Sequence, residues 1–344
     1  MAEKKIIYPD KTVLTGISPR SWEHPADRAA LNSLRAVPGL DQVMKFLVGM
    51  TNEKSLRLLF LSSTVKCSET QFPRVTSLRN EVARILDADY LPDIFVTQSP
   101  VLNAGAIGVD TPFISLNSEL VRHFSDEELL SVIAHEMAHI MSGHVLYKTL
   151  LWVLMNMGIM IFRLPLSQLV LMGLIGALRE WDRKSELSAD RAALLAVQNP
   201  EVQYRTLLKL AGGFETDQMD IQEFFAQADE YDSYGNVVDS VYKSLNLFTQ
   251  THPFPVLRIK DLRDWYESGR YEEVIQGNYP RRDGSEDDDI RKDFEEAARQ
   301  YQEDLKKSRD PLARTLSDFG ENISKGVENT AREAEEFFRN IFRS

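Results

Sequence analysis

The most restrictive feature of the sequence is a predicted helix in which three histidines stand among apolar residues. Ser125 and Glu128 form a capping-box pattern, in which each side chain bonds the backbone N–H group of the other, and this pattern marks where the helix begins. Apolar residues follow at helical spacing, at Leu129, Leu130, Val132, Ile133, Met137 and Ile140. Such a helix packs in a protein interior, where His135, His139 and His144 are costly to bury without bonding partners.

The spacing of the histidines decides which of them can share a metal ion. Each helical residue turns by about 100°, so His135 and His139 lie on one face, about 40° apart. On a continuous helix His144 falls about 180° from His135 and cannot bind the same ion. Because it follows Gly143, we expect His144 to act as a cap near the helix end.

Glu136 directly follows the first histidine and completes the His-Glu-x-x-His signature of zinc hydrolases. In this signature two neutral imidazoles bind Zn²⁺, which lowers the pKa of a water molecule, and the glutamate accepts the proton of that water. The glutamate then passes the proton to the leaving amine. The sequence therefore predicts His135 and His139 as zinc ligands and Glu136 as a general base.

A catalytic zinc ion needs a third protein ligand and one open position. The extended signature with a third histidine is excluded, because Ser142 and Val145 stand at its glycine and histidine positions. A glutamate on a later helix is the other common solution. Glu186 is the best candidate, because Asp190 follows one turn later and can orient an imidazole. Nearby alternatives are Glu180 and Asp182.

The rest of the chain predicts an α+β fold around a small sheet. We expect a buried strand at residues 55–67 and a helix at 70–88, followed by strands at 93–97, 105–109 and 111–116. The apolar run at 55–67 predicts a strand for two reasons: the run is short, and it ends in β-branched residues.

The domain division follows from composition along the chain. We predict a helical N-terminal segment at residues 1–54, a globular domain at 55–279, and a charged linker with an amphipathic helical tail at 280–344. The apolar stripe of the tail favours packing of residues 311–344 on a partner helix or on the body of the protein. Its polar face is not basic, so binding to an anionic membrane is the weaker interpretation.

Two apolar runs, at residues 150–162 and 164–178, are broken by Arg163 and Pro165. A helix of that length spans about 20 Å, against about 30 Å of bilayer hydrocarbon. One interpretation is a pair of core helices or an apolar flap over a cleft. The other is a hairpin that enters a membrane, which would give the protein a membrane contact through residues 150–178.

Composition excludes some partners and environments. The formal charge of −12 gives no electrostatic basis for binding nucleic acid. A single cysteine, Cys67, excludes an intrachain disulfide framework and agrees with a reducing compartment. The first residues contain lysines but no apolar segment of the secretory type, so we expect a cytoplasmic protein, with the cytoplasmic face of a membrane as the alternative.

Four segments in chain order carry a family resemblance. They are NAGAIG at 103–108, DEELLSVIAHEMAHIMSGH at 126–144, ELSADRAAL at 186–194 and THPFPVLRI at 251–259. Together they resemble the CAAX-prenyl-protease/HtpX-type zinc metallopeptidases, over about half of the chain (93–262). The resemblance implies a minigluzincin-type zincin fold, in which a small mixed sheet and an active-site helix precede a mostly helical C-terminal part.

The resemblance also implies roles at the metal. His135, His139 and Glu186 would bind one zinc ion per chain. Glu136 would be the general base. Asp190 would not bind the metal but would orient one of the imidazoles that do.

Further roles concern the substrate. Asn103 and Ala104 would lie on an edge strand that pairs with the substrate backbone. His252 would lie near the oxyanion of the tetrahedral intermediate, with Arg258 as support; the alternative is that the His-Pro pair is a turn that starts a helix. Gly105 departs from the family pattern, where relatives often have a larger side chain, so the shape of the adjacent subsites does not carry over.

The function implied is that of a zinc endopeptidase acting on peptide or protein substrates. Housekeeping or quality-control proteolysis near a membrane is the nearest family analogy. Cleavage of prenylated proteins is not expected, because the chain lacks the many membrane helices of that role. The alternative from another class is a non-catalytic zinc protein that assembles a complex through its apolar hairpin and tail.

Overall fold

The computed structural model of the chain describes residues 7–35, 40, 53–156, 168–233 and 254–284. The elements in chain order are η1 (Pro19–Ser21), α1 (Pro25–Arg35), α3 (Glu53–Ser63), β1 (Val65–Lys66), α4 (Pro73–Ile85), β2 (Ile94–Thr97), β3 (Ala104–Ile107), β4 (Phe113–Asn117), α5 (Ser118–His123), α6 (Asp126–Met141), α7 (Val145–Asn156), α9 (Gln168–Val197), α10 (Pro200–Gly212), η2 (Thr216–Gln218), α11 (Ile221–Ser233), α13 (Pro255–Glu267) and α14 (Arg270–Ile275). The predicted tail helix and the turn at Arg163 and Pro165 lie outside the described residues.

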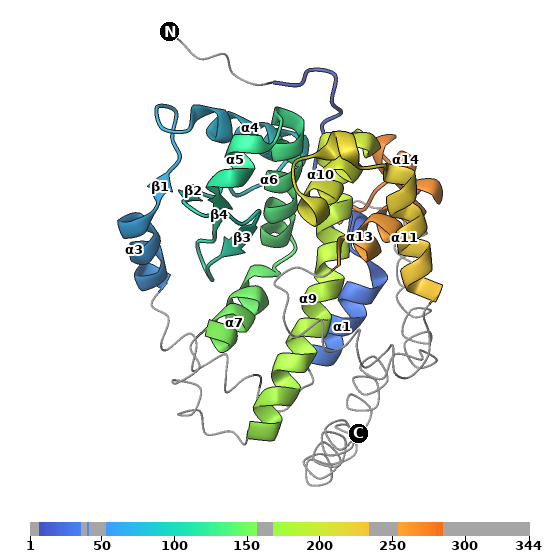
Figure 1. Cartoon of the computed structure of the whole chain (residues 1–344). Coiled ribbons are helices and arrows are strands. Elements are labelled where there is room, and N and C mark those ends of the chain that lie inside the picture. Colours follow the sequence, from blue (N-terminus) through green and yellow to red (C-terminus); the bar gives the residue numbers. More distant parts are fainter. Residues whose placement is uncertain (1–6, 36–39, 41–52, 157–167, 234–253, 285–344) are drawn as a thin grey trace.

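The sheet is small and mixed, which confirms the predicted α+β class. Its strand order is β1-β2-β4-β3. β2 and β4 run parallel, whereas β1 and β3 pair antiparallel with their neighbours. Figure 1 shows the sheet on one side of α6 and the long helix α9 on the other. The strand β3 is therefore an edge strand on the side of the sheet that α6 approaches.

The predicted strand at 55–67 is wrong: most of this run forms the helix α3, and only β1 is extended. The helical part of the run contains four leucines and one arginine, and these residues favour helix over strand. A short apolar run has no periodicity that separates the two structures. In the helix, Phe60 packs on Phe95 and Phe113 of the sheet, with ring centroids 6.0 and 4.8 Å away.

The capping box at the start of α6 is present as predicted. The Ser125 hydroxyl accepts a hydrogen bond from the Glu128 N–H group, and the Glu128 carboxylate accepts one from the Ser125 N–H group. Beyond this cap, residues 128–139 are all buried. Seven of these twelve residues are apolar, which suits a helix that is buried on every side and has no solvent-exposed polar face.

The described part of the second apolar run (168–178) and the predicted ligand segment belong to one helix of 30 residues, α9. Its first half and α7 pack together in a core that the two runs share, formed by Leu34, Leu40, Leu150, Leu151, Val153, Leu154, Ala177, Leu178 and Trp181. The interpretation of the runs as core helices therefore holds where the structure describes them. Within the described residues, no helix combines the length and apolar character needed to cross a membrane.

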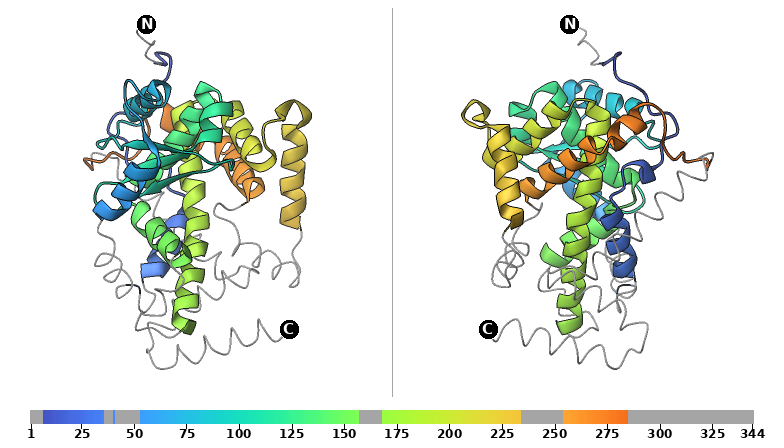
Figure 2. Two further views of the ribbon diagram at one scale, coloured as in Figure 1. Left: turned by 60° about the vertical axis from the view of Figure 1, so that its left-hand side comes forward. Right: turned by 90° about the vertical axis from the view of Figure 1, so that its right-hand side faces the viewer.

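The N-terminal segment packs into the body of the protein. Leu14, Ile17 and Trp22 are fully buried in the main core. Ile17 forms a β-bridge with Arg281, which joins this segment to the end of the described chain. Both views of Figure 2 show α1 beside α9, the helix on which it packs. The domain boundaries given above stay a prediction.

Replacing Ser125 by alanine should lower the free energy of unfolding by about 1 kcal/mol, because the Glu128 N–H group loses its acceptor. Urea denaturation followed by circular dichroism measures the change. The control is Ser63→Ala at the exposed end of α3, which should cost less than about 0.5 kcal/mol. Equal losses in the two variants would contradict the importance of the cap.

Candidate metal centre

Three side chains from two helices meet in the interior next to a cleft. His135 and His139 lie one turn apart on α6, and Glu186 lies in the middle of α9. The two histidine Nε2 atoms are 3.2 Å apart. The Glu186 carboxylate oxygens lie 3.3 Å from Nε2 of His135 and 3.2 Å from Nε2 of His139. All three side chains are buried, and together they could hold a metal ion.

The spacing and chemistry of these donors suit zinc. Tetrahedral zinc with bonds of about 2.0–2.1 Å places its ligand atoms about 3.3 Å from one another. Here the two Nε2 atoms are 3.2 Å apart, and each lies 3.2 or 3.3 Å from an oxygen of the Glu186 carboxylate, a different oxygen for each histidine. Two imidazoles with one carboxylate form a known set of ligands for catalytic zinc. The residues present therefore fit the ion that the sequence pattern predicts.

A carboxylate contacts the ring nitrogen of His135 that does not face the other candidate ligands. Asp190, one turn after Glu186 on α9, lies with its Oδ1 3.0 Å from Nδ1 of His135. Arg258 of α13 donates two hydrogen bonds to the same carboxylate, at 2.7 and 2.6 Å. Although burial would raise the pKa of Asp190, the Arg258 charge and these hydrogen bonds hold it below its usual value. Asp190 is thus a fixed anion that directs Nε2 of His135 toward the other donors.

A different partner holds the second histidine. Nδ1 of His139 lies 3.0 Å from Nδ1 of His144, which is buried rather than exposed at a helix end. α6 ends at Met141, and Gly143 turns the chain with a φ of 71°, a conformation that favours glycine. The turn brings His144 back toward the metal group. His144 lies outside the group of three, but the offset expected on a continuous helix does not apply, because α6 ends before His144, and its contact with His139 was not predicted.

The next residue in this chain of contacts is Asp27 of α1, which the sequence analysis did not identify. Its Oδ2 lies 3.1 Å from Nε2 of His144 and accepts a hydrogen bond of 2.6 Å from the Ser188 hydroxyl. Its Oδ1 accepts one of 3.0 Å from the Trp181 indole. Burial would raise the pKa of Asp27, but its contacts with His144, Ser188 and Trp181 lower it. No local sequence signal links residues so far apart in the chain.

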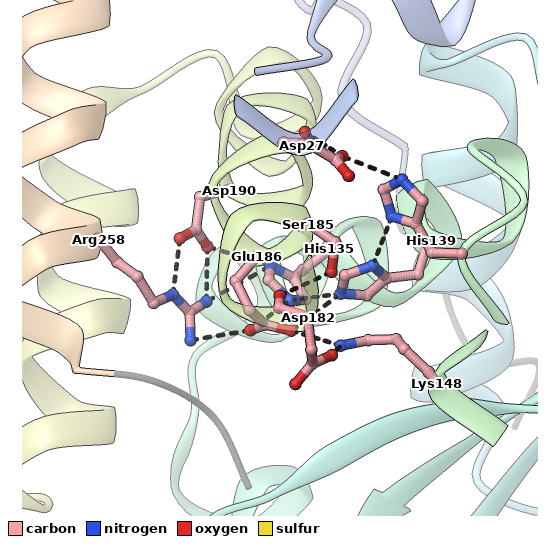
Figure 3. A network of polar contacts seen from close by, with 11 residues as sticks. Asp27, His135, His139, Lys148, Asp182, Ser185, Glu186, Asp190 and Arg258 are labelled. Carbon is pink, nitrogen blue, oxygen red and sulfur yellow. Dashed lines mark hydrogen bonds and ion pairs between the residues drawn. The ribbon is translucent and has the colours of Figure 1, made fainter. Parts of the chain in front are cut away.

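Two cations lie against the Glu186 carboxylate. Lys148 of α7 donates to it at 2.7 Å and to Asp182 at 2.5 Å. Nη1 of Arg258 lies 3.3 Å from its other oxygen. Asp182, an alternative ligand by sequence, is paired with Lys148 and is not part of the group formed by His135, His139 and Glu186. The side chain of Glu180, the other alternative, lies outside the described residues. In Figure 3, Asp27, Lys148 and Arg258 approach the histidines and Glu186 from different directions.

Glu136 lies at the wall of a cleft of about 580 Å³, together with His135. Its carboxylate is buried, and Oε2 has no hydrogen-bond partner in the described structure. Asn103 and Ala104 line the same cleft, where β3 begins. Oδ1 of Asn103 is also buried without a partner. Two residues of the cleft wall thus each carry a buried oxygen atom whose hydrogen-bonding capacity is unused.

The remaining predicted site residues are placed in part. Arg258 lines the cleft, but its guanidinium group is already bound to carboxylates. His252 lies outside the described residues, just before Phe254 and Pro255, which do line the cleft. A side chain at Gly105 would meet nothing within 4 Å, so the backbone there borders open space.

The two histidines differ in proton affinity. Burial lowers the pKa of His135, but Glu186 and Asp190 outweigh it and raise that pKa to about 9. Burial and the Lys148 charge hold the pKa of His139 well below its usual value. Near neutral pH and without metal, His135 therefore carries an extra proton that a metal ion must displace, whereas His139 is already neutral.

Comparison with known proteins gives a consistent set of relatives. The model of the family described as peptidase family M48 matches residues 69–266. The plastoglobule-localized metallopeptidase 48, chloroplastic, of Arabidopsis thaliana is 33% identical over 261 residues, which cover 74% of this chain and 75% of the plant protein. Protease HtpX of Haemophilus influenzae is 28% identical over 126 residues, 33% of this chain and 44% of HtpX. The chain thus spans less than half of that protease. No solved structure matches the chain.

Zinc binding at pH 7 should release about one proton per ion, because the metal displaces the proton of His135. Protonation competes with the metal, so the apparent zinc affinity should rise by about tenfold per pH unit from pH 7 toward the pKa of about 9. Calorimetric titrations in buffers of different ionisation enthalpy count the protons. Asp190→Asn removes one of the two carboxylates and should reduce the release. A proton count near zero for the unaltered protein would contradict the assignment.

Proposed function

The chain belongs to peptidase family M48 and is a metallopeptidase, and from this we propose that it is a zinc endopeptidase acting on protein or peptide substrates. One observation carries the proposal: Glu136 lines the cleft next to a donor group that could hold a metal, and its buried Oε2 has no hydrogen-bond partner among the described residues. In the proposed site, His135, His139 and Glu186 bind one zinc ion per chain.

The chemistry proposed for the chain's own residues is a proton transfer. A bound zinc ion supplies a Lewis acid that polarises the peptide carbonyl and lowers the pKa of the attacking water. Glu136 accepts a proton from that water as the oxygen bonds to the carbonyl carbon. Glu136 then donates the proton to the amide nitrogen as the C–N bond breaks, so that no covalent intermediate with the enzyme forms. Its unpaired oxygen supports this role, because no hydrogen-bond donor of the protein competes for the lone pairs that would accept the proton.

Substrate orientation is proposed for the edge strand. Among the described residues, the outer edge of β3 pairs with no other strand. An extended peptide can add to such an edge by backbone hydrogen bonds. Ala104 lies at the start of this strand, and Asn103 offers its unpaired amide oxygen in the same cleft. We therefore propose that both residues bind the substrate backbone.

Arg258 has a positioning role in this proposal. Its charge is engaged by Asp190 and Glu186, and the pKa of Arg258 is raised: burial opposes the charged form, but these carboxylates outweigh burial. It is therefore suited to hold Asp190 against His135. Stabilisation of the oxyanion by His252, with Arg258 as support, remains part of the proposal.

The non-catalytic alternative is set aside, because the chain is a metallopeptidase by family. Its cellular role is proposed by analogy alone: housekeeping or quality-control proteolysis at the cytoplasmic face of a membrane. The plant relative is named for a plastoglobule location. Apolar side chains that this chain exposes include Trp152 and Met155 on α7 and Leu58 and Leu59 on α3, which favours a contact with lipid or with a partner protein.

Glu136→Gln should keep zinc bound but lower peptide cleavage by several orders of magnitude, since the amide cannot accept the proton. Glu186→Ala should instead lower the zinc content. Zinc analysis of each purified variant and a peptide-library cleavage assay provide the two measurements. Glu127→Gln, half-buried in the first turn of the same helix and paired with Lys11 away from the metal group, is the matched control and should retain both properties. Substantial cleavage by Glu136→Gln at saturating substrate would rule out the general-base assignment.

A membrane contact should depend on exposed residues of α7 rather than on its buried ones. Leu150 and Leu154 belong to the core, so substitutions are confined to Trp152→Asn and Met155→Asn. The double variant should float with liposomes less than the unaltered chain. Leu91→Asn, at another exposed apolar position, serves as control. Failure of the unaltered protein to float would show that this face of α7 makes no membrane contact.

A further inference from the structure

The two proposed zinc ligands on α6 are held by different kinds of partner. His135 has the carboxylate of Asp190 at its Nδ1 atom. His139 has another imidazole there, that of His144, at 3.0 Å. A carboxylate can only accept a hydrogen bond from an imidazole, but a histidine can either donate or accept one. The contact of His139 therefore needs a further group that decides its direction.

The direction follows from the position of the metal group. His139 directs Nε2 toward His135 and Glu186, so a metal ion would bind that nitrogen and the proton of the neutral ring would be on Nδ1. Nδ1–H of His139 then donates to Nδ1 of His144, which must carry its own proton on Nε2. That nitrogen lies 3.1 Å from Oδ2 of Asp27, an acceptor. The contacts form one directed chain from Asp27 to the metal group.

The other arrangement is incompatible with metal binding. If His144 carried its proton on Nδ1, two N–H groups would face each other across 3.0 Å. His139 could relieve this only by moving its own proton to Nε2, where the proton would occupy the position of the metal bond. The acceptor at residue 27 thus determines which nitrogen of His139 is available.

Asp27 is held firmly in this position. It is fully buried, and its oxygens also accept hydrogen bonds from Ser188 and Trp181 of α9. It lies on α1, which precedes the family match at residues 69–266. We propose that Asp27 and His144 are positioning residues that hold His139 in its metal-binding tautomer, so that α1 is a component of the metal centre. The inference rests on the proposed zinc ligands and adds His144 and Asp27 to the centre, of which Asp27 lies outside the matched region.

The sharpest test is Asp27→Asn, because Trp181 fixes the orientation of the new amide. The indole N–H can only donate, so the amide oxygen turns toward Trp181 and the amide NH₂ group toward His144. His144 must then accept at Nε2 and carry its proton on Nδ1, which is the incompatible tautomer. We expect zinc affinity to fall by about 10- to 100-fold, as measured by competition with a chromophoric chelator.

Two further variants separate positioning from general stability. His144→Asn keeps an acceptor near Nδ1 of His139, whereas His144→Leu has none. Zinc affinity should stay within a few-fold of the unaltered protein in the first and fall by about 10- to 100-fold in the second. Ser188→Ala removes a hydrogen bond to the same Asp27 oxygen but leaves the link to His144, and it should bind zinc normally.

The tautomers can be read directly from imidazole ¹⁵N shifts of the zinc-loaded full-length protein. The proton of His144 should be on Nε2 in the unaltered chain and on Nδ1 in Asp27→Asn. Unchanged shifts and zinc affinity in Asp27→Asn, with zinc binding abolished in His139→Ala, would overturn the proposal and leave the zinc ligands standing. Full zinc binding in His139→Ala would instead overturn the ligand assignment and the proposal together.

Discussion

The packing of α6 on α9 is the interaction on which the rest of the structure depends. The three candidate ligands come from these two helices, so one helix contact sets their separation. Small residues of both helices are buried in the same core, and small side chains let helices approach closely: Ala134 and Ala138 on α6, and Ala189, Ala192, Ala193 and Ala196 on α9. Larger side chains would move Glu186 away from the histidine pair. A site built on packed helices is also held more precisely than one built on loops.

Close packing buries several charges, and each is costly unless it is paired. Asp190 is paired with Arg258, and Glu186 with both Lys148 and Arg258. Lys148 is tied in turn to Asp182, and its pKa is raised, since these two carboxylates outweigh burial. Against this background the unpaired oxygen of Glu136 is informative. The charged residues around the metal group are paired with one another. The carboxylate of Glu136, which is proposed to take a proton from the attacking water, keeps one oxygen without a partner.

The sequence predicted those parts whose signals are local. The capping box at Ser125 and the helical spacing located α6, and the spacing of His135 and His139 identified two candidate ligands that share a face. The strand at 55–67 was wrong because a short apolar run is compatible with either structure. Asp27 could not be predicted, since its role depends on how α1 packs against α9.

The position of Glu186 within α9 links the metal group to both hydrophobic cores. The part of α9 before Glu186 places Leu178 and Trp181 in the core shared with α7. The part after Glu186 places Ala193 and Leu194 in the main core with α6. Trp181 also donates to Asp27, so the second core contacts the support of His139 directly. A ligand that binds only the folded state stabilises it by about 2.7 kcal/mol at a concentration 100 times its Kd. Zinc would join α6 to the middle of α9, where the two cores meet. Its binding free energy would therefore stabilise the packing of both cores and not only the walls of the cleft.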